Sequence, residues 1–192
     1  YALACARAAY DAGARWIVLC DTNGGTQPTE VREIVSAVIA SGIPGANLGI
    51  HAHDDTGQAV ANSLAAVDAG VRQIQGTLNG IGERCGNANL STIIANLQLK
   101  YDISCIPEDR LDQLTPLTRK MADVANLTLP NGEPYVGLSA FSHKGGMHVD
   151  GVKKNPITFE HIDPRTVGNN RRFLLSEVSG RSAVLDIIRK VK

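Results

Sequence analysis

Two histidines, His51 and His53, stand one residue apart where an apolar stretch of the chain gives way to polar residues. On a β-strand, residues i and i+2 project to the same face, so both imidazole rings can reach one ion. Neutral imidazole binds Zn, Mn, Fe or Co, and nearby oxygen ligands extend the choice to Mg. The pair therefore predicts a divalent metal site. Two histidines leave that site incomplete, so we expect a third ligand, preferably a carboxylate, from elsewhere.

A second group of polar side chains lies between Gly76 and Asn87, where four glycines alternate with Asn79, Glu83 and Arg84. Such a mixture suits close approach of the backbone to a ligand and oriented polar groups around it. A cap at the start of the following helix would explain Asn87 or Asn89. It would not explain Glu83 and Arg84 together. We expect a binding loop in which Asn79 and Glu83 contact substrate.

Alternating strands and helices must position these residues. Short apolar runs predict strands, the first of them buried on both faces, and stretches with apolar residues at helical spacing separate them. The predicted strands are 16–20, 48–51 and 71–75; helices are predicted before the first strand, from Pro28 onward, around 60–67 and through 90–97. This alternation indicates parallel strands with right-handed crossovers, in a doubly wound sheet or a (β/α)8 barrel.

Each predicted strand ends in polar residues, and in both folds the carboxyl ends of parallel strands are where ligands bind. The neighbouring polar tips favour a metal site over the alternative that His51 and His53 are simply polar residues at a strand end. Three strands with polar tips look like the last portion of a TIM barrel, because a complete barrel takes around 250 residues. We expect the chain to begin within a longer protein, since Tyr1 already lies in a helical pattern.

The pattern changes after about Tyr101. One amphipathic helix is expected from Glu108 to Asn126, followed by irregular structure with an exposed histidine loop from His143 to His148. We therefore predict an α/β protein of two parts: residues 1–103 form a partial TIM-barrel catalytic domain, and residues 104–192 form a mostly helical subdomain that contributes a loop to the active site.

Composition narrows the class of function. The 192 residues are 43% hydrophobic and 20% charged, with nineteen basic and nineteen acidic side chains. This balance gives no field that would attract nucleic acid or an anionic membrane, so small molecules are the expected partners. No apolar run approaches the roughly 20 residues that span a bilayer, and a cytoplasmic location is expected. The cysteines lack a C-x-x-C pair and are expected to be reduced; they are Cys5, Cys20, Cys85 and Cys105.

Three motifs in order along the chain resemble the signature of the isopropylmalate, homocitrate and citramalate synthase family: His51-Ala-His-Asp-Asp55, Asn62-Ser-Leu-Ala-Ala-Val67 with Ala69-Gly70, and Gly76-Thr-Leu-Asn-Gly-Ile-Gly-Glu-Arg-Cys-Gly-Asn87. Two further stretches are most similar to the citramalate synthase branch: Cys20-Asp-Thr-Asn-Gly-Gly25, and Pro134-Tyr-Val-Gly137 with His143-Lys-Gly-Gly-Met-His148. One departure is that many relatives carry Asn where this chain has Asp54, which adds a negative charge near the expected metal.

The resemblance implies a role for five of the candidate residues. His51 and His53 would be direct metal ligands, and Asn87 would complete the metal shell, directly or through water. Thr22 would hold the carboxylate of a 2-oxo acid, and His143 would assist proton transfer. The remaining metal ligand of the family is an aspartate on the first strand, beside a catalytic arginine. Neither is in this sequence, so the fragment is not expected to be active alone.

The implied reaction is a metal-dependent Claisen condensation of acetyl-CoA with a 2-oxo acid, catalysed by a homodimeric acyltransferase of branched-chain amino-acid biosynthesis. The cofactor would be Mg, Mn or Zn, with acetyl-CoA as co-substrate. Branch resemblance favours pyruvate as acceptor, giving citramalate, over 2-oxoisovalerate (2-isopropylmalate synthase) or the acceptor of homocitrate synthase. Remoter alternatives are a hydroxymethylglutaryl-CoA-type lyase, a metal-dependent amidohydrolase and a metal-binding module without catalysis.

Overall fold

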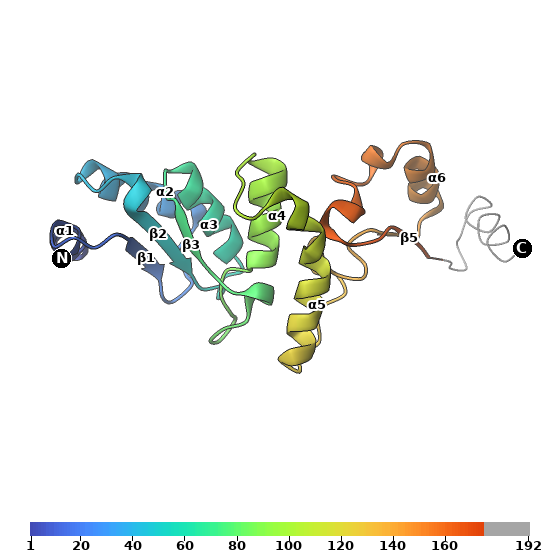
Figure 1. Ribbon diagram of the computed structural model, residues 1–192, viewed down its shortest axis with the longest axis horizontal. Coiled ribbons are helices and arrows are strands. Elements are labelled where there is room, and N and C mark those ends of the chain that lie inside the picture. Colours follow the sequence, from blue (N-terminus) through green and yellow to red (C-terminus); the bar gives the residue numbers. More distant parts are fainter. Residues whose placement is uncertain (175–192) are drawn as a thin grey trace, which may run out of the picture. The chain divides into compact units, whose positions relative to one another are not determined.

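The computed structural model describes residues 1–174, and contacts within it divide the chain into two compact units, Tyr1–Ile103 and Ser104–Lys192. The first unit is α/β, with strands and helices alternating along the chain (Figure 1). Its elements are α1 (Ala2–Asp11), β1 (Ile17–Asp21), α2 (Pro28–Ala40), the short helix η1 (Gly45–Asn47), β2 (Leu48–Ala52), α3 (Ala59–Asp68), β3 (Gln73–Gln75), η2 (Leu78–Gly80) and α4 (Leu90–Lys100).

The strands form a parallel sheet in the order β1-β2-β3, so the prediction of parallel strands with helical crossovers is confirmed. Cys20 of β1 and Gln75 of β3 lie on either side of His51 in the register. All three strands therefore end at the same edge of the sheet. The third strand is shorter than predicted because the amide of Val71 still bonds to the helical carbonyl of Ala66, and ladder pairing begins only at Gln73.

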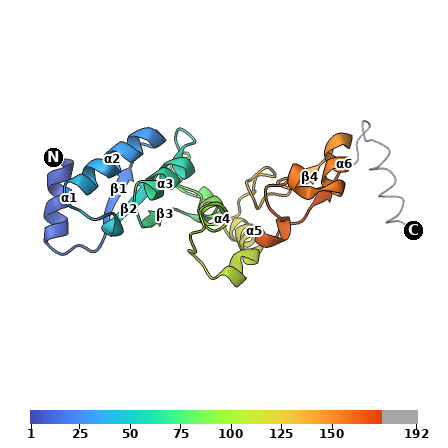
Figure 2. The same ribbon diagram turned by 90° about the horizontal axis from the view of Figure 1, so that it is seen from above.

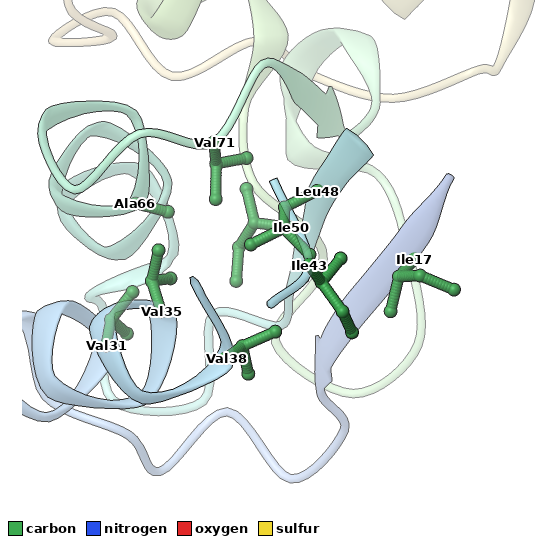
Figure 3. Close-up of a cluster of buried hydrophobic side chains, with 9 residues drawn as sticks. All are labelled: Ile17, Val31, Val35, Val38, Ile43, Leu48, Ile50, Ala66 and Val71. Carbon is green, nitrogen blue, oxygen red and sulfur yellow. The ribbon is translucent and has the colours of Figure 1, made fainter. Parts of the chain in front are cut away.

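A cluster of buried aliphatic side chains holds α2 and α3 against one face of this sheet (Figure 3). Its members are Ile17, Val31, Val35, Val38, Ile43, Leu48, Ile50, Ala66 and Val71. Figure 2 shows α2 and α3 side by side along the strands. The apolar positions of α2 recur at helical spacing, so a single face of the helix enters the core. The helix begins at Pro28, where the missing N–H costs nothing.

The prediction that the first strand is buried on both faces is wrong for the described residues. Ile17 is buried, but Val18 and Leu19 are half-buried and Cys20 is exposed. Within the described part of the chain, β1 is an edge strand, and an apolar hollow beside it is lined by residues of α1 and by Trp16 and Leu19. The apolar composition of β1 indicates only that the strand can be buried. The extent of its burial depends on which elements cover each face.

Most elements of the second unit are helices as far as it is described, joined by long irregular segments. Its elements are η3 (Glu108–Gln113), α5 (Leu114–Val124), β4 (Ser142–His143), α6 (Gly146–Lys154), η4 (Pro156–Thr158), η5 (Pro164–Val167) and β5 (Arg172–Phe173), with β4 and β5 paired in parallel. The single helix expected from Glu108 to Asn126 is divided at Leu114. Pro116 explains the division, because its ring cannot follow an α-helical carbonyl at Asp112 and is tolerated only in a first turn.

The segment from His143 to His148 is also not the loop that we expected. His143 belongs to β4, and His148 lies in the first turn of α6. No helix among residues 1–174 is long and apolar enough to cross a bilayer. All four cysteines are free and exposed.

Candidate functional site

The two histidines lie at the carboxyl end of β2. His51 is the penultimate residue of the strand, and His53 follows its last residue. Their rings are neighbours, with centroids 5.2 Å apart and planes inclined by 63°. Both side chains are half-buried. The spacing of one residue thus brings two imidazoles together at the edge of the sheet where ligands bind in parallel α/β folds.

Asn87 reaches the same place from the loop after β3. Its backbone pairs with His53 in an isolated antiparallel bridge, and its amide donates to the carbonyl of Gly80 at 2.9 Å. The side-chain Nδ2 donates to the carbonyl of Ile81 at 3.2 Å, which leaves Oδ1 directed elsewhere. Backbone pairing between residues 34 positions apart in sequence therefore places Asn87 beside His53.

Two polar atoms of this bridge are buried without a hydrogen-bond partner among the described residues: Nδ1 of His53 and Oδ1 of Asn87. Buried polar atoms are nearly always paired, so two orphans on bridged residues indicate a missing polar or ionic partner. Imidazole nitrogen and amide oxygen are both metal ligands. Within residues 1–174 no group of three or more His, Cys, Asp or Glu side chains could hold a metal. The residues present therefore fit a cation as part of a larger ligand set.

Two neighbouring polar side chains accept backbone amides at helix N-termini. Asn89 caps α4, since its Oδ1 accepts the amide of Ser91 at 2.9 Å. The capping alternative is thereby satisfied by Asn89, and Asn87 stays free for another role. Asp54 Oδ1 accepts the amide of Ala59 at 2.8 Å, at the start of α3. The extra charge of Asp54 is thus engaged at a helix N-terminus, where a carboxylate is favoured.

The other predicted residues of this unit follow β1 or β3. Thr22 is exposed immediately after β1, and Glu83 is exposed in the loop after β3. Asn79 is half-buried in η2 and adopts a left-handed conformation with φ of 62°. The sheet therefore brings these residues and the histidines to one edge, as the strand-tip pattern predicted. Their contacts with substrate stay predictions.

An ion pair that the sequence did not reveal connects these tips. Arg84 forms a fork with the carboxylate of Asp55, with Nε 2.7 Å from Oδ1 and the terminal nitrogen 2.8 Å from Oδ2. The same nitrogen donates to the carbonyl of Thr22 at 2.8 Å. Hydrogen bonding from Arg84 lowers the pKa of the Asp55 carboxyl. The sequence identified Arg84 as part of the glycine-rich loop. Its partner Asp55, 29 residues earlier, could not be predicted from residue spacing.

In the second unit, the expectation of an exposed His143 is wrong. The residue is only 7% exposed, and its Nε2 lies 2.9 Å from Oε1 of Glu160. Arg171 holds both oxygens of the same carboxylate, with Nε 2.7 Å from Oε1. Burial alone would raise the pKa of Glu160, but hydrogen bonds from Arg171 and His143 outweigh it and lower that pKa. A buried carboxylate needs such partners, and His143 is one of them.

His148 differs from His143 in its surroundings. Its ring is exposed and stacks on Phe159, with centroids 4.3 Å apart and an interplanar angle of 24°. Of the two histidines in the motif, His148 has the ring that a ligand can reach.

Comparison with known proteins agrees with this architecture. A family model described as HMGL-like matches residues 1–118, and one described as homocitrate synthase post-HMGL domain-like matches residues 135–192. The chain is 54% identical over 191 residues to an (R)-citramalate synthase of Synechocystis, covering 96% of this chain and 35% of that protein. It is 53% identical to an (R)-citramalate synthase of Aquifex aeolicus, covering 100% of this chain and 36% of that protein. The chain thus spans about a third of the length of these relatives.

More distant relatives named as homocitrate synthases or a probable 2-isopropylmalate synthase are 37% to 41% identical. Among solved structures, an HMG-CoA lyase of Bacillus subtilis superposes with a TM-score of 0.59 at 25% identity, covering 67% of this chain and 44% of that one. The α/β class and the resemblance drawn from the motifs are confirmed. With its first 118 residues matched by the family model and its strand-end histidines in place, the chain belongs to the HMGL-like family.

Proposed function

We propose that the full-length protein condenses acetyl-CoA with a 2-oxo acid, and that the acceptor is pyruvate, giving citramalate. The observation that supports this most strongly is the bridged pair His53 and Asn87, whose buried ligand atoms lack partners, in a chain 54% identical to an (R)-citramalate synthase. Identity falls to 37–41% for relatives named for other acceptors, which favours pyruvate.

His51, His53 and Asn87 would hold a divalent cation, Mg, Mn or Zn, together with a carboxylate from outside this sequence. The cation would supply Lewis acidity, polarising the carbonyl of the 2-oxo acid and stabilising the alkoxide that develops. Thr22, exposed at the tip of β1, would bind the acceptor's carboxylate. Asn79 and Glu83 would contact substrate from the loop after β3, where the backbone holds them near the same edge.

Proton transfer is the role proposed for His143. Its ring is held by Glu160, whose carboxylate is held in turn by Arg171, so a proton would pass through a histidine of fixed orientation. His148 is the alternative for this role because its ring is exposed. A homodimer is proposed from the family resemblance, and a cytoplasmic location from the sequence pattern. The balanced charge is in keeping with small-molecule partners.

The decisive test is to express the full-length gene product and measure CoA release from acetyl-CoA with pyruvate, 2-oxoisovalerate and 2-oxoglutarate in parallel, with Mg or Mn supplied. We expect release with pyruvate to exceed that with either other acceptor. Preference for another acceptor would reassign the substrate, and no release with any acceptor would refute the synthase function. Cleavage of hydroxymethylglutaryl-CoA, assayed alongside, would favour the lyase instead.

Substituting Gly82 tests whether Asn87 belongs to the metal site. An added Cβ at Gly82 would lie 2.8 Å from Cγ of Asn87, so the asparagine must move. We expect Gly82→Ala to weaken Mn²⁺ binding by the full-length protein by about tenfold, the lower end for a disturbed metal shell. Isothermal titration calorimetry measures this. Gly132→Ala is the matched control, because nothing lies within 4 Å of its added Cβ; equal affinities in the two variants would exclude Asn87 from the site.

A further inference from the structure

Three loops meet at the carboxyl edge of the sheet, and one guanidinium, borne by the third loop, contacts the other two. Arg84 lies in the loop after β3, Asp55 in the loop after β2, and the Thr22 carbonyl follows β1. We propose that the Arg84–Asp55 ion pair is a latch that positions the metal-binding groups, by fastening the loop that bears Asn87 to the segment that bears His51 and His53. This inference rests on the proposed metal-dependent function.

The latch has the geometry of a specific interaction. Both contacts of the fork are shorter than 3 Å, and the third contact, to the Thr22 carbonyl, uses a nitrogen already engaged by Asp55. Another ion pair in this unit, Arg32 with Asp68, makes one hydrogen bond at 3.2 Å between exposed side chains. A bidentate guanidinium–carboxylate pair fixes the relative orientation of the two side chains as well as their distance. A single exposed contact does not.

The loop after β3 needs such fastening. Residues 79, 80, 84 and 86 all have positive φ, and two of them, Asn79 and Arg84, are not glycine. A left-handed conformation is unfavourable for a non-glycine residue, so it persists where surrounding contacts impose it. The loop is also compact, since an added Cβ at Gly86 would collide with the carbonyl of Gly80. Arg84 thus adopts an unfavoured backbone conformation in the place where its side chain makes three contacts.

The latch lies close in sequence to the ligand groups on both sides. Arg84 precedes Asn87 by three residues, and Asp55 follows His53 by two. Between them, the amide of Asp54 donates to the carbonyl of Gly86 at 3.0 Å, and His53 bridges Asn87. The ion pair therefore adds a side-chain connection beside a short backbone one. Loss of this connection leaves only the backbone link to keep Asn87 in line with His53.

The test compares Mn²⁺ affinity of the full-length protein with that of Arg84→Gln, Asp55→Asn and the double variant, by isothermal titration calorimetry. Each single variant should bind Mn²⁺ about tenfold more weakly, as for loss of an outer-shell partner. The double variant should be no weaker than the weaker single variant, because both changes remove one interaction. Arg84→Lys should recover part of the affinity, since lysine keeps the charge without the fork.

Arg32→Gln is the matched control and should bind Mn²⁺ like the wild type, because its ion pair links α2 to α3 away from the strand ends. The visible absorption of bound Co²⁺ should shift in Arg84→Gln and not in Arg32→Gln, which a general loss of stability would not produce. Unchanged affinity and spectrum in both Arg84→Gln and Asp55→Asn would overturn the latch alone. A wild-type protein that binds no Mn²⁺ would overturn the proposed function, and the latch with it.

Discussion

Replacing His53 with alanine should abolish condensation and reduce the metal content of the full-length protein below detection. His53 contributes a buried Nδ1 that has no partner among the described residues and is bridged to Asn87. Loss of a direct ligand should weaken metal binding by more than the roughly 10- to 100-fold that loss of an outer-shell partner costs. His51→Ala should behave in the same way, because its ring lies 5.2 Å from that of His53.

Metal content after dialysis, measured by inductively coupled plasma mass spectrometry, and CoA release with pyruvate are the two readouts. Glu33→Ala is the control, since Glu33 is exposed on α2 and should leave both unchanged. Wild-type metal content and turnover in His53→Ala would overturn the assignment of this residue as a ligand. Retained metal with lost turnover would instead make His53 a substrate-binding group.

Glu160→Gln should destabilise the second unit by about 3 kcal/mol, a value typical of breaking a buried ion pair. The Glu160 side chain is 1% exposed and is the shared partner of His143 and Arg171. Glutamine is neutral and leaves Arg171, two thirds buried, without its counter-charge. Differential scanning calorimetry of the full-length protein measures the change as a lower Tm.

The effect should depend on pH in a defined direction. The pKa of Glu160 is lowered in the folded protein, so ionised Glu160 stabilises the fold above the ordinary glutamate pKa of about 4.3. This contribution is lost as pH falls through the lower folded-state pKa. The Tm difference between wild type and Glu160→Gln should therefore have its largest value at pH 7 and decrease below about pH 4.3.

Glu108→Gln provides a matched substitution at an exposed position of the same unit and should leave Tm unchanged. A Tm difference between wild type and Glu160→Gln that stays constant from pH 7 to pH 3 would contradict the assignment of the stabilising charge to Glu160. Loss of activity without loss of stability would instead point to a role for the Glu160–His143 pair in proton transfer.

The elements of the first unit were largely predictable from the sequence, because each follows from local patterns. The α2 helix has apolar residues at helical spacing and a proline that starts it, and β2 is an apolar run between turn residues. The i, i+2 spacing of His51 and His53 was enough to predict that their rings would be neighbours. The division of the helix at Leu114 was missed, although Pro116 stood in the sequence as its cause.

Other features depended on residues far apart in the chain. Burial of β1 on one face only depends on which elements cover it, and a strand's composition does not report this. The burial of His143 depends on Glu160 and Arg171, 17 and 28 positions later, and its position between Ser142 and Lys144 gives no sign of them.

By itself, the sequence determined which chemistry this chain can offer: histidines at a strand end, a glycine-rich polar loop, and the family to which both belong. Only the tertiary structure decided which of these groups meet. It paired Asn87 with His53, assigned the helix cap to Asn89, and linked Arg84 to Asp55 across 29 residues. The physical reason is that residue type and spacing fix local conformation. The partners of buried charges and buried polar groups come from distant segments that only the folded chain brings together.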